Sequence, residues 1–83
     1  MHQEVLSPLS PLAQQIVVGG LYEHYKKLPY RVLSIARHSE TLEELVVYQA
    51  LYGERGIWVR PLAMFLENVS VNGESTPRFK LLD

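Results

Sequence analysis

Short runs of alternating apolar and polar residues, separated by turn-forming residues, dominate this chain. Residues 21–25 (LYEHY) and 30–36 (YRVLSIA) are rich in aromatic and β-branched side chains, and they alternate as strands with one buried face do. Alternation places Tyr22 and His24 on the same face of the first run. Because residues 26–29 (KKLP) between the runs favour a turn, the pattern predicts an antiparallel hairpin.

The next segment, residues 37–49 (RHSETLEELVVYQ), allows two interpretations. Thr41 followed three residues later by Glu44 matches the capping box that begins many helices, and apolar residues follow at helical spacing. Residues 46–48 (VVY) are instead β-branched and aromatic, which favours a strand. This segment alone does not decide between a helix and a strand.

The sequence that follows favours the strand. Residues 53–56 (GERG) are a strong turn signal, and residues 57–60 (IWVR) have the composition of a short strand. A hairpin is therefore the economical interpretation. It predicts a polar turn over residues 38–43 that leads into a strand over residues 45–52.

The last third of the domain begins at Pro61, which cannot donate to a sheet and suits the first position of a helix. Apolar residues recur at helical spacing over residues 62–69, which predicts one short helix there. Asn72 and Gly73 form the strongest short hairpin signal in the chain. Brief strands are expected at residues 69–71 and 75–76 on either side of this turn, and residues 77–81 are expected to form a closing strand or a tail.

Together these patterns predict a mainly β fold of five to six short antiparallel strands with one short helical insert. A small sheet of this kind is expected to curl or close, because closure removes exposed edges. Residues 1–15 are expected to form an N-terminal tail, in which Ser10 could cap one helical turn. Residues 16–83 are expected to form a single domain.

Composition narrows the function only by exclusion. The 83 residues suit one domain, and a net charge of −1 gives no general attraction to nucleic acid or anionic membranes. The chain has no cysteine, which excludes disulfides, thiolate zinc sites and a cysteine nucleophile. No apolar run approaches the ~20 residues of a membrane span, and no secretion signal is visible. We therefore expect a cytoplasmic protein with no membrane association and no cofactor.

Several blocks of residues spread over residues 17–80 carry a family resemblance. In chain order they are residues 20–26 (GLYEHYK), Tyr30 with Val32, residues 37–41 (RHSET), residues 46–48 (VVY), Trp58 with Arg60 and Pro61, Met64 with Phe65, and residues 77–79 (PRF). In this combination the chain resembles the bacterial DUF1653 family. The resemblance implies a small SH3-like β-barrel or roll, but no activity, because the function of that family is unknown. At residues 26–29 the chain lacks the family's basic residue-glycine turn, so this turn is expected to differ.

Histidines close to carboxylates are the first candidates for chemistry. His24 and His38, with Glu40 and Glu43 nearby in the sequence, could bind a metal or transfer protons. No HExxH or similar spacing is present, and half-buried histidines that order a turn are the simpler interpretation. Ser39 lacks the surroundings of a nucleophile and is expected to satisfy backbone groups in a turn. We therefore assign no catalytic residue and no metal ligand.

Aromatic residues beside basic ones are the second candidates. Tyr48 and Trp58 are expected near Arg60 and His24, and such a face could stack bases or hold a peptide. Alternatively, the aromatic rings fill the core and Arg60 lies over Trp58 or pairs with a glutamate. The candidate ligand-binding residues are His24, His38, Glu40, Tyr48, Trp58 and Arg60.

Three hypotheses for the function follow. The first is a non-catalytic binding module with a peptide or RNA ligand. The second is a small-molecule enzyme or metal-binding domain that uses histidine and glutamate residues. The third is a structural module that associates with itself, for example as a homodimer. The exposure of His38, Trp58 and Arg60 discriminates between them, because a site must be open whereas a core must be buried.

Overall fold

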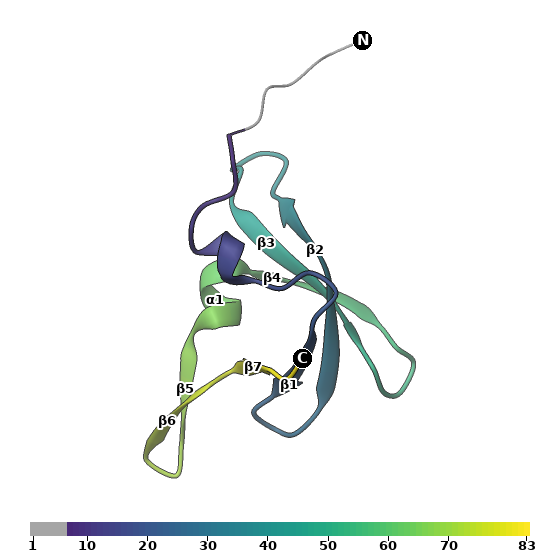
Figure 1. Ribbon diagram of the computed structural model, residues 1–83, viewed down its shortest axis with the longest axis vertical. Coiled ribbons are helices and arrows are strands. Elements are labelled where there is room, and N and C mark those ends of the chain that lie inside the picture. Colours follow the sequence, from purple (N-terminus) through teal and green to yellow (C-terminus); the bar gives the residue numbers. More distant parts are fainter. Residues whose placement is uncertain (1–6) are drawn as a thin grey trace.

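The computed structural model describes residues 7–83. Within this range, seven strands form two antiparallel sheets, accompanied by one short α-helix and one 3₁₀ turn (Figure 1). A five-stranded sheet has the order β4-β3-β2-β1-β7, and β5 pairs with β6 in a separate hairpin. In chain order the elements are η1 (Ala13–Gln15), β1 (Leu21–His24), β2 (Pro29–Arg37), β3 (Glu44–Ala50), β4 (Ile57–Pro61), α1 (Leu62–Leu66), β5 (Asn68–Val71), β6 (Glu74–Pro77) and β7 (Phe79–Leu81).

The mainly β class and the single helical insert predicted from the sequence are confirmed. The described residues contain seven strands rather than five or six, because the segment expected as a closing strand or tail forms the strand β7 in addition to β5 and β6. The Asn72-Gly73 turn joins β5 to β6 as the pattern predicted. The predicted tail falls in part on residues 1–6, which lie outside the described residues.

The turn over residues 38–43 excludes the helical interpretation of this segment. The Nδ1 atom of His38 accepts the backbone N–H groups of Glu40 (3.1 Å) and Thr41 (3.3 Å). The Thr41 hydroxyl accepts the N–H of Glu43 at 3.2 Å, so Thr41 orders a turn instead of capping a helix. Leu42 has a φ of 64°, which is incompatible with the first turn of a helix. A strand, β3, follows directly.

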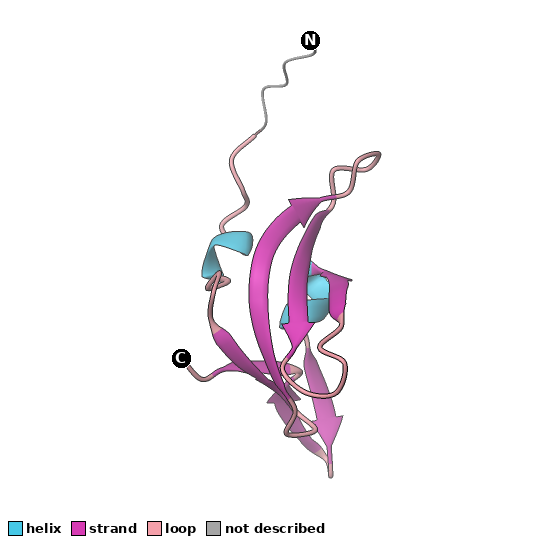
Figure 2. Ribbon diagram, turned by 90° about the vertical axis from the view of Figure 1, so that its right-hand side faces the viewer, coloured by secondary structure: helices cyan, strands magenta, loops and turns pink. Residues whose placement is uncertain are grey.

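The five-stranded sheet is strongly curved, so its two edge strands, β4 and β7, approach each other. Phe79 on β7 contacts Tyr48 on β3, with 5.3 Å between ring centroids, and lies 5.9 Å from the guanidinium carbon of Arg60 on β4. An irregular register at Leu33 on β2 is the kind of bulge that increases local twist. Figure 2 shows the bend of the long strands. Within residues 7–83, β4 and β7 do not pair, so the sheet is an open roll and no closed barrel forms.

Aromatic rings fill the concave side of the sheet. Phe65 on α1 is fully buried and stacks on Phe79 with 4.2 Å between centroids. Tyr22 and Tyr48 meet the Phe65 ring edge-on. Leu62 lies one helical turn before Phe65 and is also buried, so the i, i+3 spacing places both side chains on the core face of α1.

The segment before β1 packs on the domain. The Ser10 backbone N–H and hydroxyl both donate to the carboxylate of Glu44 at the start of β3, at 2.8 and 2.6 Å. The same hydroxyl accepts the N–H of Ala13 at 3.1 Å, as a capping side chain does at the start of a helical turn. Ala13 is buried, and the Tyr22 hydroxyl accepts the N–H of Val17. We call the contacts between Ser10 and Glu44 the Ser10–Glu44 clasp.

Candidate binding site

The six candidate residues from the sequence do not form one group. His38 and Glu40 lie in the turn that follows β2, whereas His24 lies near Tyr30 at the beginning of that nine-residue strand. The His38 ring is occupied by backbone N–H groups of its own turn. The grouping of His38 and Glu40 with the other four residues is therefore corrected: strand β2 separates them.

Three of the other candidates surround Phe79 where the two edges of the curved sheet approach each other, which we call the mouth of the roll: His24, Tyr48 and Arg60. Tyr48, on β3, contacts Phe79, and its hydroxyl accepts a hydrogen bond from Arg60 Nε at 3.3 Å. His24, at the end of β1, meets the Phe79 ring edge-on with 5.0 Å between centroids. Tyr48 is buried, while His24 and Arg60 are half-buried. The expectation that Arg60 lies over Trp58 is replaced by a contact with Phe79.

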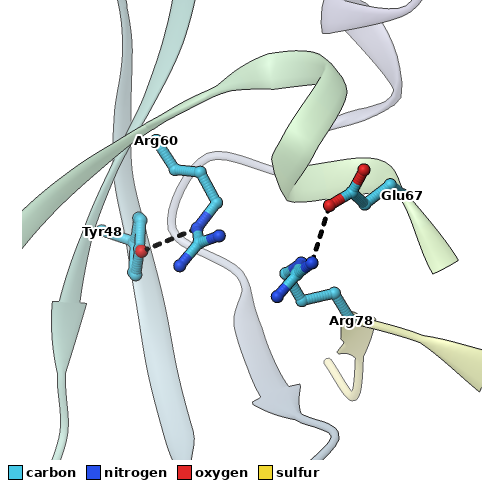
Figure 3. A network of polar contacts seen from close by, with 4 residues as sticks. All are labelled: Tyr48, Arg60, Glu67 and Arg78. Carbon is cyan, nitrogen blue, oxygen red and sulfur yellow. Dashed lines mark hydrogen bonds and ion pairs between the residues drawn. The ribbon is translucent and has the colours of Figure 1, made fainter. Parts of the chain in front are cut away.

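Arg78, which directly precedes β7, brings a second guanidinium group to this mouth. Figure 3 shows the side chains of Arg60 and Arg78 extending into the same space from different elements. One terminal nitrogen of Arg78 donates to the carboxylate of Glu67 at 2.6 Å. The Nε atom of Arg78 is buried and has no hydrogen-bond partner among residues 7–83. A buried donor without a partner is costly. A ligand oxygen that accepted a hydrogen bond from this N–H would therefore be stabilising.

His24 is held in its neutral form by these surroundings. Partial burial lowers its pKa from the ordinary value of 6.5, and repulsion from Lys26, Arg78 and Arg60 lowers it further. Its Nδ1 accepts the backbone N–H of Lys26 at 3.2 Å, which also requires an unprotonated nitrogen. The site therefore offers a neutral imidazole beside the two arginines.

A pair of tyrosines extends the aromatic wall. Tyr30 contacts Tyr48, Phe79 and His24, and its hydroxyl is hydrogen-bonded to that of Tyr52. Burial raises the pKa of Tyr30 to about 12, and the hydrogen bond with Tyr52 adds to the effect. The phenol of Tyr30 therefore stays protonated at neutral pH and offers a hydroxyl group without charge.

Strand β4 forms one edge of the five-stranded sheet and is unusually apolar for an open edge. Ile57, Trp58 and Val59 are each about 60% exposed (62%, 59% and 58%). Trp58 lies opposite Tyr48, on the same face as Arg60. The interpretation in which Trp58 fills the core is therefore wrong, because the ring extends beyond the core at the edge of the sheet.

A polar cavity of about 430 Å³ lies beside His24, between the β1–β2 turn and the β5–β6 hairpin. Charged side chains of both signs line it, including Glu23, Lys27, Glu74 and Lys80. Among the described residues, no group of three or more histidine, aspartate or glutamate side chains could hold a metal ion. The same part of the chain contains no helix long and apolar enough to cross a membrane.

Comparison with known proteins places the chain in a family. The sequence model of the family described as "Protein of unknown function (DUF1653)" matches residues 20–81. The chain belongs to the DUF1653 family. A crystal structure described as that of a DUF1653 protein from Bordetella bronchiseptica is 38% identical to this DUF1653 chain, with a TM-score of 0.70. The match covers 80% of this chain and 87% of the other. No curated protein matches the chain.

Arg78 and Glu67 are the site residues of this DUF1653 chain that the sequence reasoning missed. Arg78 lies within the family block at residues 77–79, and no pattern in the sequence singles out Glu67. They meet because β7 pairs with β1 and follows the β5–β6 hairpin. The signal in the sequence was an arginine directly before the aromatic Phe79. Its partner, Glu67, could be found only from the way the strands pair.

Proposed function

We propose that this domain is a non-catalytic binding module that recognises an extended segment of another protein by strand addition to the open edge of β4. The proposal rests on the exposure of large apolar side chains along this unpaired edge. Three consecutive large apolar residues, Ile57, Trp58 and Val59, are mostly exposed on a strand that has a partner on one side only.

The backbone of β4 supplies free hydrogen-bonding groups in the required positions. Ala50 donates to the carbonyl of Gly56 at 2.9 Å. Together with the register, this hydrogen bond determines which residues of β4 direct their backbone groups toward β3. Because bonding alternates along an antiparallel pair, Trp58 and Arg60 point their backbone groups toward β3. Ile57 and Val59 therefore point their N–H and C=O groups outward, where an added strand can bond to them.

A protein segment is favoured over RNA by charge and by shape. The net charge is −1, and the lysines beside the site alternate with Glu23 and Glu74, so the basic groups form no continuous track for a phosphate backbone. A bare strand edge offers a regular ladder of main-chain donors and acceptors, which an extended peptide matches and a nucleic acid does not. Trp58 beside this edge offers a large apolar contact for a side chain of the added strand.

The proposal is tested with Trp58 itself, because it is the single tryptophan of the chain and is exposed. A panel of capped, tryptophan-free extended peptides is titrated while Trp58 fluorescence is followed. Binding is expected to shift the emission to shorter wavelengths as the indole leaves water. The variant Val59→Pro removes an outward N–H without breaking the ladder to β3 and is expected to abolish binding. The matched variant Val59→Thr keeps that N–H and is expected to bind.

Three results would overturn the proposal. One is a folded Val59→Pro protein that binds the selected peptides as tightly as the wild type. Another is a panel in which single-stranded RNA binds and no peptide does. The third is a β4-dependent homodimer, seen by sedimentation and lost in Val59→Pro, with no peptide binding; this would favour the self-associating module.

A further inference from the structure

The two edges of the sheet each bring a guanidinium group to the same gap. Arg60 extends from β4, and Arg78 extends from the residue before β7 (Figure 3). His24 meets the Phe79 ring edge-on, with 5.0 Å between centroids. The centroid of the Phe79 ring lies 5.9 Å from the guanidinium carbon of Arg60.

The positive charge in this gap is only partly balanced. Among residues 7–83, Glu67 is the one carboxylate that forms an ion pair with either arginine, and it contacts a single nitrogen of Arg78. Two arginines and one glutamate leave a net charge of one positive unit. The hydrogen bond of Arg60 within the described residues uses Nε, which leaves its two terminal nitrogens available. The buried Nε of Arg78 has no partner there.

We infer that Arg60 and Arg78 together receive a carboxylate side chain of the bound segment. The inference rests on the proposed function, because the segment that pairs with β4 carries the carboxylate to the gap. A carboxylate accepts hydrogen bonds only, and its two oxygens match the parallel donors of a guanidinium group. Glu67 balances one of the two arginine charges, so one positive charge remains. The single negative charge of a carboxylate balances it, whereas a phosphate dianion carries one negative charge too many.

The geometry of strand addition gives the ligand a sequence pattern. Side chains of an extended segment alternate between faces, so those beside Trp58 and Arg60 on the concave side are two residues apart. The segment is therefore expected to carry an aspartate or glutamate two residues away from a large apolar side chain. The remaining positions face the convex side or the solvent and are expected to tolerate substitution.

A matched pair of peptides tests this pattern. A binding peptide with glutamate at the position beside Arg60 is compared with the same peptide carrying glutamine there. Glutamate is expected to bind about tenfold or more tightly, as a charge-assisted hydrogen bond to a partly desolvated arginine allows. Arg78→Gln and Arg60→Gln are each expected to remove this preference. Lys80→Gln makes the same change of charge at an exposed position on β7 and is expected to retain it.

A second measurement uses simple anions and does not depend on any peptide. Acetate and inorganic phosphate are titrated at constant ionic strength while the Nε–H signal of Arg78 and the titration of His24 are followed by NMR. Acetate is expected to shift the Arg78 signal and to raise the pKa of His24, because a bound negative charge offsets the two arginines. Both effects are expected to disappear in Arg60→Gln, which leaves the Glu67 contact intact.

The possible failures are distinguishable. If glutamate and glutamine peptides bind equally well, the inference is wrong and the proposed function stands. If no peptide binds, the proposed function is wrong, and the acetate titration alone decides whether the arginine pair receives a carboxylate. If phosphate shifts the Arg78 signal at concentrations tenfold lower than acetate does, the assignment of a carboxylate is overturned.

Discussion

Leu42 occupies the left-handed region, with a φ of 64°, although it is neither glycine nor asparagine. This conformation costs an ordinary L-residue about 1–2 kcal/mol, because Cβ approaches the following carbonyl oxygen. Its side chain is 62% exposed, so burial contributes little in return. Asn72 and Gly73 adopt positive φ angles in the β5–β6 turn, where their types suit the conformation. Leu42 is thus a residue whose type conflicts with its backbone.

Replacing Leu42 by asparagine is expected to raise the free energy of unfolding by about 0.5–1 kcal/mol, because asparagine tolerates the left-handed region better. Urea denaturation followed by circular dichroism measures the change. Leu42→Ala is the matched control, since it also removes the leucine side chain but lacks the polar group with which asparagine hydrogen-bonds the local backbone. Equal stabilities for the asparagine and alanine variants would show that backbone strain is not the cause.

At the scale of elements, the Ser10–Glu44 clasp fixes the first described segment to the start of β3. The two hydrogen bonds from Ser10 lower the pKa of Glu44 below its ordinary value of 4.5, assisted by Arg37. A carboxyl group with a lowered pKa stabilises the folded state above its unfolded value. This stabilisation is lost as the pH falls from about 4.5 through the lower pKa of the folded protein.

The variant Ser10→Ala is expected to lower the free energy of unfolding by about 0.5–2 kcal/mol at neutral pH, as other lost capping hydroxyls do. It is also expected to flatten the dependence of stability on pH below about 4.5, because Glu44 then titrates more nearly as it does in the unfolded chain. Thermal unfolding at a series of pH values measures both effects. In the Glu44→Gln background, Ser10→Ala is expected to cost less; equal costs in the two backgrounds would mean that the two residues act independently.

Most elements could be predicted from local sequence, because their signals are local. The strand over residues 30–36 appears as β2, and the turn at Asn72-Gly73 appears between β5 and β6. The site could be predicted only in part. Tyr48 and Arg60 were placed near each other because they lie on neighbouring strands of one hairpin. Arg78 was not placed near them, because no pattern in the sequences of β1 and β7 indicates that these two strands pair.

At the scale of the whole molecule, the core depends on a stack of two rings from distant parts of the chain. Phe65 on α1 and Phe79 on β7 lie parallel, with 4.2 Å between centroids and 5° between planes. Tyr22 on β1 and Tyr48 on β3 complete the contacts of Phe65. A domain of this size buries a small core, so each of these rings carries a large share of the stability.

Phe65→Ala is expected to cost about 3–5 kcal/mol, because it leaves a cavity at a fully buried position. This is most or all of the stability expected for so small a domain. Met64→Ala, at the neighbouring position on α1, is expected to cost far less, because Met64 is 44% exposed. Urea denaturation of both variants measures the difference. A Phe65→Ala protein as stable as Met64→Ala would show that the ring stack does not organise the core.

The pairing of β7 with β1 also has a consequence for how the protein is made. The N–H of Leu21 donates to the carbonyl of Asp83 at 2.7 Å, and Leu82 donates back to Leu21 at 2.8 Å. The ribosome releases the chain from its N-terminal end, so β1 emerges while its partner strand is still being synthesised. Until then the inner face of the sheet lacks Phe79, and its apolar rings stay exposed. The domain therefore completes its fold only after its last strand has left the exit tunnel.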